Sequence, residues 1–411
     1  MSVKIRRLAV SGMAVAFALT FGLAPAAQAA AIPSPRVAIL GQKSAQIAVA
    51  QRGPVKLELL QPDPADALAY ARAGVGRVTL ELGWDAYEPA PGVLNTTYLD
   101  QRLAEARVYQ ASGIQVVLDL GLQYPPSWAW SLPGGTRFVN QFGDTWHGGI
   151  GDNPINAVWN RAARQAQARA VRELAHYTAG TSFVAVRVGG LLSGELRLPP
   201  SKYNGRTGSL WAFDPSALAS SPLPSYRPGK GTTAAAARWL DWYLQSLTDY
   251  QDWLTTTVYD AFPATAIDVL LPGWGLRPGD AQAAAGARLR PAAVAATGDS
   301  LSSAVDWSRQ VAALAGTHLP VVLTTTWVDA PSYGLSTHDM APVEYLARLA
   351  APRQMAVGGE NTGGGNATTL SWSLQQARRL GLTQIAWMSA ATLRTGPLSL
   401  EQLGDAFAGT Y

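Results

Sequence analysis

The chain has 411 residues and contains no cysteine, only four histidines, and charged side chains at 15% of its positions. The lack of cysteine excludes disulfides, thiolate metal sites and cysteine nucleophiles. None of the histidines shows the H-E-x-x-H or H-x-H spacing of metal ligands, so we expect no metal. We also expect no cofactor, because Gly363-Gly364-Gly365 is not followed by the Lys-Ser or Lys-Thr of a phosphate-binding loop.

Long apolar runs are missing from the chain except at its N-terminus. Three basic residues within positions 4–7 precede an apolar stretch, Leu8–Leu23, and the small-x-small pattern Ala27-Gln28-Ala29 follows it. This order is typical of a secretory signal peptide. We therefore expect residues 1–29 to be a signal that is cleaved near Ala29, the protein to be secreted, and no integral membrane segment to remain.

Charge of either sign is also scarce once that segment is set aside. Residues 1–29 hold three basic and no acidic side chains, so their removal lowers the formal net charge from +4 to about +1. A nearly neutral protein lacks the basic surface that binds nucleic acid or anionic lipid. We therefore expect no nucleic-acid partner, and nothing in the sequence indicates an oligomeric state.

From residue 55 onward, short apolar runs alternate with Ala-rich amphipathic segments. Each run is almost continuous in apolar side chains, as in parallel strands that are buried on both faces. Eight such runs separated by crossover helices favour a closed (β/α)₈ TIM barrel, an α/β fold, over an open doubly wound sheet. The expected strands are Val55–Leu60, Arg77–Leu82, Ile114–Leu120, Phe183–Gly189, Ala266–Leu271, Pro320–Thr325, Gln354–Gly359 and Gln384–Met388.

The domain organisation follows from this pattern. We expect residues 30–54 to form an N-terminal extension and residues 55–411 to form one barrel domain. The first strand is the least distinct, and the alternative is that Val37–Ala50 forms an N-terminal strand or hairpin instead. Two long connections follow the third and fourth strands and belong on the C-terminal face, where barrel enzymes carry their sites. The expected helices are Tyr98–Ser112, Asn156–Tyr177, Ala234–Phe262, Ser303–Leu314, Pro342–Leu349 and Leu370–Leu380.

Two glutamates follow glycines at the ends of expected strands. Glu195 comes shortly after the fourth strand, preceded by Gly194, and Glu360 directly ends the seventh strand after Gly358-Gly359. Side chains at the C-terminal ends of barrel strands converge on one site. A carboxyl pair there can flank a glycosidic bond, one protonating the leaving oxygen and the other acting as nucleophile or base. We therefore predict that Glu195 and Glu360 are a catalytic pair that acts on a carbohydrate.

Several other side chains near strand ends are candidates for the site. Glu81 and Asp119 lie within strand-like runs, where Arg77 or Arg187 could pair with them. Glu88, which precedes a proline, is expected to be a structural hydrogen-bond acceptor. Indole rings and polar groups after strands are candidates for sugar contacts, and we assign this role to Trp84, Trp128, Arg197, Trp274, Trp327, Asn361 and Trp387.

Residues 76–92 contain Trp84-Asp85-Ala86-Tyr87-Glu88-Pro89-Ala90-Pro91-Gly92, which resembles the second-strand region of clan A glycoside hydrolases, notably the family 42 β-galactosidases. Those chains carry a similar W-x-x-x-E-P-x-x-G signature, then a helix and a strand like residues 113–118, then a P-x-W element like Pro126-Ser127-Trp128. The resemblance implies a retaining barrel hydrolase with its acid/base on strand four and its nucleophile on strand seven. Those positions are Glu195 and Glu360.

The chain departs from that pattern at one position. Clan A enzymes place Asn directly before the acid/base, whereas Gly194 stands here. The string from Gly194 to Ser201 resembles the acid segment of the family 14 β-amylases, which invert configuration, and Gly359-Glu360-Asn361 resembles their base segment. The sequence predicts a secreted retaining hydrolase of a β-linked glycoside. An inverting glucan hydrolase of the β-amylase kind and a non-catalytic carbohydrate-binding barrel remain open.

Overall fold

The computed structural model describes residues 54–148, 153–263 and 265–409. The expected signal segment, residues 30–53 of the expected extension and the alternative strand Val37–Ala50 lie outside the described residues. In the part of the chain that the structure describes, no helix is both long and apolar enough to cross a membrane.

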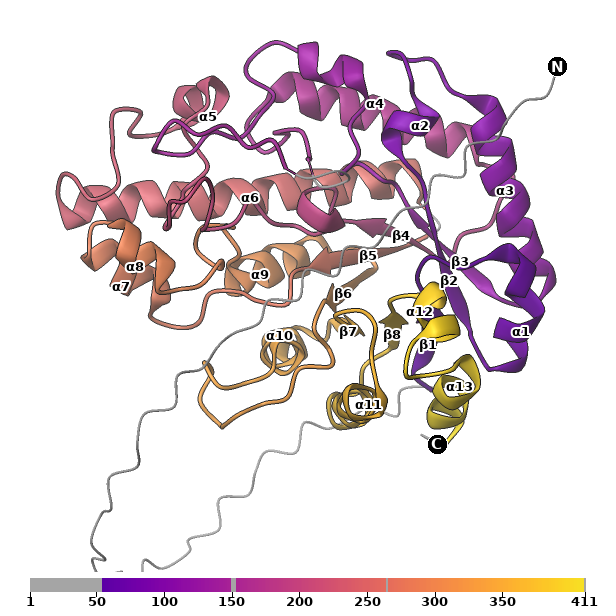
Figure 1. Ribbon diagram of the computed structural model, residues 1–411. Coiled ribbons are helices and arrows are strands. Elements are labelled where there is room, and N and C mark those ends of the chain that lie inside the picture. The colour runs from indigo at the N-terminus through magenta and orange to yellow at the C-terminus, as the bar shows by residue number, and fades with distance from the viewer. Residues whose placement is uncertain (1–53, 149–152, 264, 410–411) are drawn as a thin grey trace, which may run out of the picture. The chain divides into compact units, whose positions relative to one another are not determined.

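Eight parallel strands close into one barrel, as Figure 1 shows. Each strand pairs with the next in sequence, and β8 pairs with β1 through the register Leu57–Ile385 and Leu59–Trp387. The predicted (β/α)₈ fold and all eight predicted strands are confirmed, including the indistinct first one. The strands are β1 Lys56–Leu59, β2 Arg77–Glu81, β3 Gln115–Asp119, β4 Ala185–Val188, β5 Ala266–Leu271, β6 Val321–Thr325, β7 Ala356–Glu360 and β8 Gln384–Trp387.

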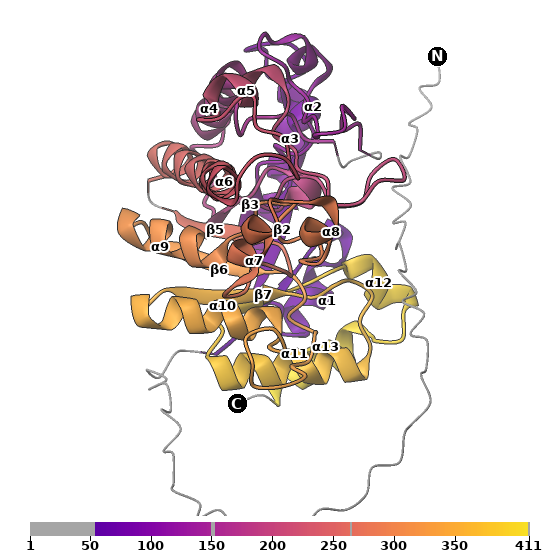
Figure 2. The ribbon, with the colours of Figure 1, turned by 90° about the vertical axis from the view of Figure 1, so that its left-hand side faces the viewer.

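Helices surround the barrel, and in Figure 2 α6, α9, α10 and α11 follow one another along one side. The six predicted helices are confirmed as α3 Thr96–Ala111, α4 Arg161–Tyr177, α6 Thr233–Ala261, α9 Trp307–Thr317, α10 Pro342–Ala350 and α11 Ala367–Leu380. Seven further helices were not predicted, and all of them except α13 span only four to seven residues, which show too little of a 3.6-residue period. They are α1 Ala67–Arg72, α2 Trp84–Tyr87, α5 Pro215–Ser220, α7 Asp280–Gly286, α8 Pro291–Ala295, α12 Ala390–Thr395 and α13 Leu400–Ala408.

Side-chain caps determine where the long helices begin. The Asn160 side chain accepts a hydrogen bond from the backbone N–H of Ala163, so α4 begins five residues later than the predicted start at Asn156. The Asp306 side chain likewise accepts from the N–H of Arg309, so α9 begins at Trp307 and not at Ser303. These two predicted starts were wrong because a polar residue before an apolar stretch was counted as part of the helix.

The barrel interior is polar, which corrects the expectation that both faces of every strand are apolar. Alternate residues of each strand face outward to the helices, and on β1 these are Leu57 and Leu59. The residues between them meet inside the barrel, where side chains of nonadjacent strands contact one another. The interior side chains so connected are Glu58, Thr79, Arg187, Asp268, Thr324, Glu360 and Gln384.

Candidate active site

Glu360 is the last residue of β7 and is 4% exposed. The Nη1 atom of Arg187 donates a hydrogen bond to its Oε2 at 3.0 Å. Two glycines before it allow close packing at this strand end. A Cβ atom at Gly358 would lie 2.7 Å from the Gln384 side chain, and one at Gly359 would lie 2.5 Å from that of Val328. The two glycines therefore permit close approach between parts of the protein at this strand end.

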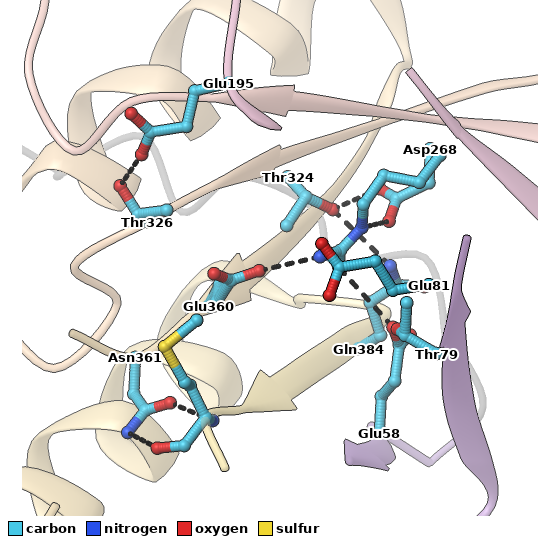
Figure 3. A network of polar contacts seen from close by, with 12 residues as sticks. Glu58, Thr79, Glu81, Glu195, Asp268, Thr324, Thr326, Glu360, Asn361 and Gln384 are labelled. Carbon is cyan, nitrogen blue, oxygen red and sulfur yellow. Dashed lines mark hydrogen bonds and ion pairs between the residues drawn. The ribbon is translucent and has the colours of Figure 1, made fainter. Parts of the chain in front are cut away.

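Arg187 lies on β4 and is surrounded by carboxyl groups. Besides Glu360, it forms ion pairs with Glu58 on β1 and Asp268 on β5, each at 3.4 Å. Burial alone lowers the pKa of Arg187, but the surrounding carboxylates outweigh it and hold this pKa above its ordinary value. A permanently charged guanidinium thus lies beside Glu360. In Figure 3, Glu360 lies between Asp268 and Glu58 on one side and Glu195 on the other.

The pKa of Glu360 is raised to about 7. Burial is the main cause, because a carboxylate loses hydration inside the barrel. The charge of Arg187 lowers the pKa, whereas the negative charges of Glu195, Glu58 and Asp268 raise it further. Glu195 and Glu360 are therefore close enough to interact electrostatically, and Glu360 changes charge near neutral pH.

Glu195 lies beyond the end of β4, after a single 3-10 turn, Leu192–Gly194. Its carboxyl is buried and accepts hydrogen bonds from Arg197 Nε to Oε2 at 2.6 Å and from Thr326 Oγ1 to Oε1 at 2.9 Å. The loop returns to the strand it has just left, since the carbonyl of Gly194 accepts a hydrogen bond from the N–H of Gly190. A Cβ atom at Gly189 would lie 1.8 Å from that same carbonyl oxygen, so only glycine fits there.

The structure thus brings Glu195 and Glu360 to one end of the barrel, as Figure 3 shows, although they are 165 residues apart in sequence. Their surroundings differ in kind. The partner of Glu360 comes from inside the barrel, and the partners of Glu195 come from the loops above it. Most glycoside hydrolases use a pair of carboxyls at one site, and this arrangement is compatible with that use. Their catalytic role stays a prediction.

Gly194, where the clan A pattern has Asn, has a φ of +73°. A Cβ atom there would lie 3.3 Å from the Nε2 of Gln123, so this amide already fills the neighbouring space. Gln123 is buried, and its Nε2 donates to Glu81 at 3.2 Å. At the position where the clan A pattern has Asn, this chain therefore has Gly194. The side-chain amide of Gln123, from the loop after β3, packs against it.

Three of the predicted sugar-binding residues gather beside Glu195. Arg197 bonds its carboxyl, and the guanidinium carbon of Arg197 lies 5.2 Å from the ring centre of Trp274. Trp274 in turn meets Trp327 edge to face, with ring centres 5.4 Å apart. Trp327 is 42% exposed, unlike most tryptophans of the described chain. Arg197, Trp274 and Trp327 therefore extend from Glu195 toward solvent.

Two further predicted residues lie near Glu360 but are held by the protein. Asn361 is buried, and its Oδ1 accepts a hydrogen bond from the N–H of Met388 at 2.6 Å. Trp387 is fully buried, and a Cβ atom at Gly365 would lie 2.2 Å from its ring. Its register partner is Leu59, on the outward face of β1, whereas the partner of Glu360 is Ala386. The Trp387 side chain thus lies on the face opposite to Glu360.

The remaining two predicted tryptophans belong to a structural cluster around Glu88. This buried carboxylate accepts hydrogen bonds from the Trp84 indole at 2.6 Å, the Gly92 N–H at 2.7 Å and the Arg169 guanidinium at 2.7 Å. The Trp128 indole donates to the Glu88 carbonyl and meets Trp84 edge to face. The predicted structural role of Glu88 is confirmed.

Glu81 and Asp119 are register partners at the ends of β2 and β3. Burial raises the pKa of Asp119 to about 7, the charge of Glu81 adds to this, and Arg187 opposes it. Glu81 accepts hydrogen bonds from Tyr124 and Gln123. Arg77, the other expected partner, instead donates to Gln384.

Sequence reasoning missed three residues that this site uses. Thr326 bonds Glu195, and Glu58 and Asp268 share Arg187 with Glu360. For the two acids, the available signal was a single carboxyl within an otherwise apolar strand, which requires a buried partner. Across residues 54–148, 153–263 and 265–409, no group of three or more metal-binding side chains is arranged to hold a metal ion.

No protein-family model matches the chain, and no curated protein matches it. Several solved structures, in contrast, match the chain. The catalytic domain of a β-amylase from Paenibacillus polymyxa matches with a TM-score of 0.68 and 14% sequence identity, over 87% of this chain and 100% of that one.

Two β-galactosidases also match this chain. The enzyme from the psychrophilic Marinomonas ef1 gives a TM-score of 0.58 at 12% identity, over 87% of this chain and 59% of its own. The enzyme from the haloarchaeon Halorubrum lacusprofundi gives 0.53 at 13% identity, over 87% and 57%. The chain therefore spans less than two thirds of either β-galactosidase. At such low identities the likeness shows a shared fold, the (β/α)₈ barrel of β-amylase and β-galactosidase structures.

Proposed function

We propose that this protein is a glycoside hydrolase whose catalytic groups are Glu195 and Glu360. The observation that carries the proposal is the placement of two buried, electrostatically coupled carboxyls after β4 and at the end of β7. The fold shared with β-amylase and β-galactosidase structures supports it. A carbohydrate is accordingly the partner that we propose for the site.

In the proposed reaction, Glu195 donates its proton to the glycosidic oxygen as the bond from that oxygen to the anomeric carbon breaks. Arg197 and Thr326 then stabilise the carboxylate that is left on Glu195, because both donate hydrogen bonds to it. Glu360 in its ionised form attacks the anomeric carbon. Glu195 next takes a proton from water, whose oxygen replaces Glu360 on that carbon, so that configuration is retained.

A second candidate, an inverting hydrolase of the β-amylase kind, is favoured by two observations. The chain covers the whole of the β-amylase catalytic domain, and Gly194 stands where clan A enzymes have Asn. In this reaction Glu360 takes a proton from a water molecule, which itself attacks the anomeric carbon. Substrates of the two candidates differ, a β-linked glycoside for retention and an α-glucan for inversion.

The first experiment is release of reducing sugar from soluble β-glucan, β-galactan, β-mannan, xylan and starch by the purified protein, with Glu360→Ala alongside. Release that disappears in the variant supports the hydrolase, and the polysaccharide cleaved identifies the sugar. Proton NMR of the first-formed anomer then separates retention from inversion. A folded protein that binds one of these polysaccharides without cleaving it contradicts the proposal and favours the carbohydrate-binding barrel.

We further propose that the protein is secreted, on the strength of its signal-like residues 1–29. N-terminal sequencing of the protein recovered from the culture medium tests this. A mature N-terminus close to residue 30 is the expected result. An uncleaved protein that stays with the cells contradicts it.

A further inference from the structure

Trp327 lies between two residues that contact the catalytic pair. The preceding residue, Thr326, bonds the carboxyl of Glu195, and the N–H of the following residue, Val328, donates to the carbonyl of Glu360 at 2.9 Å. The same segment is anchored to β5, because the Thr326 N–H donates to the carbonyl of Leu271. Hydrogen bonds to Glu195 and Glu360 thus fix the chain on both sides of Trp327.

The backbone and side chain of Trp327 are held in an unusual arrangement. Its φ is +65°, a left-handed conformation that is rare for a bulky residue and is found where the surrounding structure enforces it. A Cβ atom at Gly273 would lie 2.4 Å from the Trp327 ring, so the ring packs directly on the backbone there. Trp274 supports it edge to face.

One part of the Trp327 side chain is left open despite this support. The residue is 42% exposed, whereas Thr326 and Val328 beside it are buried. A large apolar ring that the fold fixes in place and yet leaves accessible is suited to an apolar face of a ligand. The carbon-bound hydrogens of a pyranose ring form such a face.

From this geometry we propose that Trp327 is the platform for the sugar on the leaving-group side of the bond that is cleaved. The inference rests on the glycosidase proposed above. Glu195 delivers its proton to the leaving oxygen, so the sugar that carries this oxygen lies on the Glu195 side of the site. Trp327 is the exposed aromatic ring that adjoins Glu195 through Thr326 and Trp274.

The test compares a substrate that has a leaving sugar with one that has none. The wild type and Trp327→Ala are assayed on cellotetraose, β-1,4-galactotetraose, β-1,4-mannotetraose, β-1,4-xylotetraose and maltopentaose. Each is also assayed on the glycosyl fluoride with the same non-reducing sugar and anomeric configuration. For the oligosaccharide that the wild type cleaves, we expect kcat/KM to fall by about tenfold or more in Trp327→Ala. With the matching fluoride we expect a change of less than about twofold, because no sugar contacts Trp327.

Tyr333→Ala is the matched control, since Tyr333 is an aromatic residue of the same connection and is 85% exposed. Tyr333→Ala is expected to leave kcat/KM unchanged on both the oligosaccharide and the fluoride. An equal loss on both substrates in Trp327→Ala would overturn the inference and show that Trp327 only supports Glu195. No loss on the oligosaccharide would overturn it as well.

Failure of the glycosidase proposal has a different signature, namely a wild type that cleaves none of these compounds. Calorimetric titration with the same five oligosaccharides then tests the platform on its own. Weaker binding by Trp327→Ala than by the wild type supports the platform. Equal binding, or no binding by either protein, overturns it.

Discussion

Glu360 and Glu195 lie at the same end of one barrel, yet different parts of the molecule control them. Glu360 belongs to a strand, and its partner Arg187 is shared with Glu58 and Asp268 inside the barrel. Glu195 belongs to a loop, and its partners Arg197 and Thr326 come from loops. The difference indicates that the barrel interior sets the charge of one acid, while the connections set the position of the other.

Removing either carboxyl is expected to have the largest effect. Glu195→Gln and Glu360→Gln should each lower kcat by about 10³-fold or more, because neither amide can transfer the proton or attack the anomeric carbon. Steady-state assays on the substrate identified above measure this, and circular dichroism checks the fold. The control is Glu401→Gln, which alters an exposed carboxyl at the start of α13 and should keep full activity. A variant of either acid that keeps most of its activity would contradict the assignment of that residue.

The two arginines should differ in their effect on stability. Arg187→Met leaves buried carboxyls without their shared cation and is expected to lower the free energy of unfolding by about 3–5 kcal/mol. Arg197→Met removes one partner from a carboxyl that keeps Thr326, and we expect less than about half that loss. Urea denaturation of both variants measures the difference. Equal losses would show that the two acids depend equally on their cations.

Stability should also fall as the pH rises, because of Glu360. Its pKa is about 7 in the folded protein against an ordinary value of 4.5. Below both values the carboxyl is protonated in the folded and unfolded chains alike, so it has no effect. Between them only the unfolded chain releases the proton, and above pH 7 the full penalty of about 3 kcal/mol is reached. Unfolding at pH 4.5 and at pH 8 should therefore differ less in Glu360→Gln than in the wild type, and parallel pH dependences would contradict this cause.

The smallest expected effect is a shift in the pH profile. Asp268 raises the pKa of Glu360, so Asp268→Asn should lower this pKa. Because Glu360 acts in its ionised form, the acidic limb of kcat/KM should move to lower pH by up to about one unit. Asp280→Asn, which removes a carboxylate paired with the exposed His338, should leave the profile unchanged. A shift toward higher pH would show that Asp268 acts on another group.

Much of the fold was predictable because barrel strands carry a strong local signal. Eight short apolar runs separated by helical segments correspond to β1–β8, and their order places the end of β7 and the loop after β4 at one face. The five residues of β7, Ala356–Glu360, were enough to place Glu360 at the end of a strand. The helix starts were less accurate, since a cap such as Asn160 depends on the backbone conformation of a single residue.

The functions of individual aromatic residues could not be predicted in this way. Trp84, Trp327 and Trp387 all stand near strand ends, yet only Trp327 is exposed. The distinction depends on packing against Glu88 for Trp84 and against Gly365 for Trp387. The contact between Trp387 and Gly365 joins different segments of the chain, and the hydrogen bond between Trp84 and Glu88 depends on the local fold of α2. A position near a strand end does not reveal either contact.

The amino-acid sequence by itself therefore established the closed barrel, the place of Glu360 and the candidacy of Glu195, because periodicity and glycine spacing are local properties of the chain. Only the folded barrel brings Arg187 to Glu360 together with Glu58 and Asp268 on the same guanidinium. It likewise brings Thr326 and Arg197 to Glu195. The physical reason is that burial and electrostatic interaction depend on distance in space. Closing the sheet makes neighbours of residues as far apart in sequence as Leu59 and Trp387, which are separated by 328 positions.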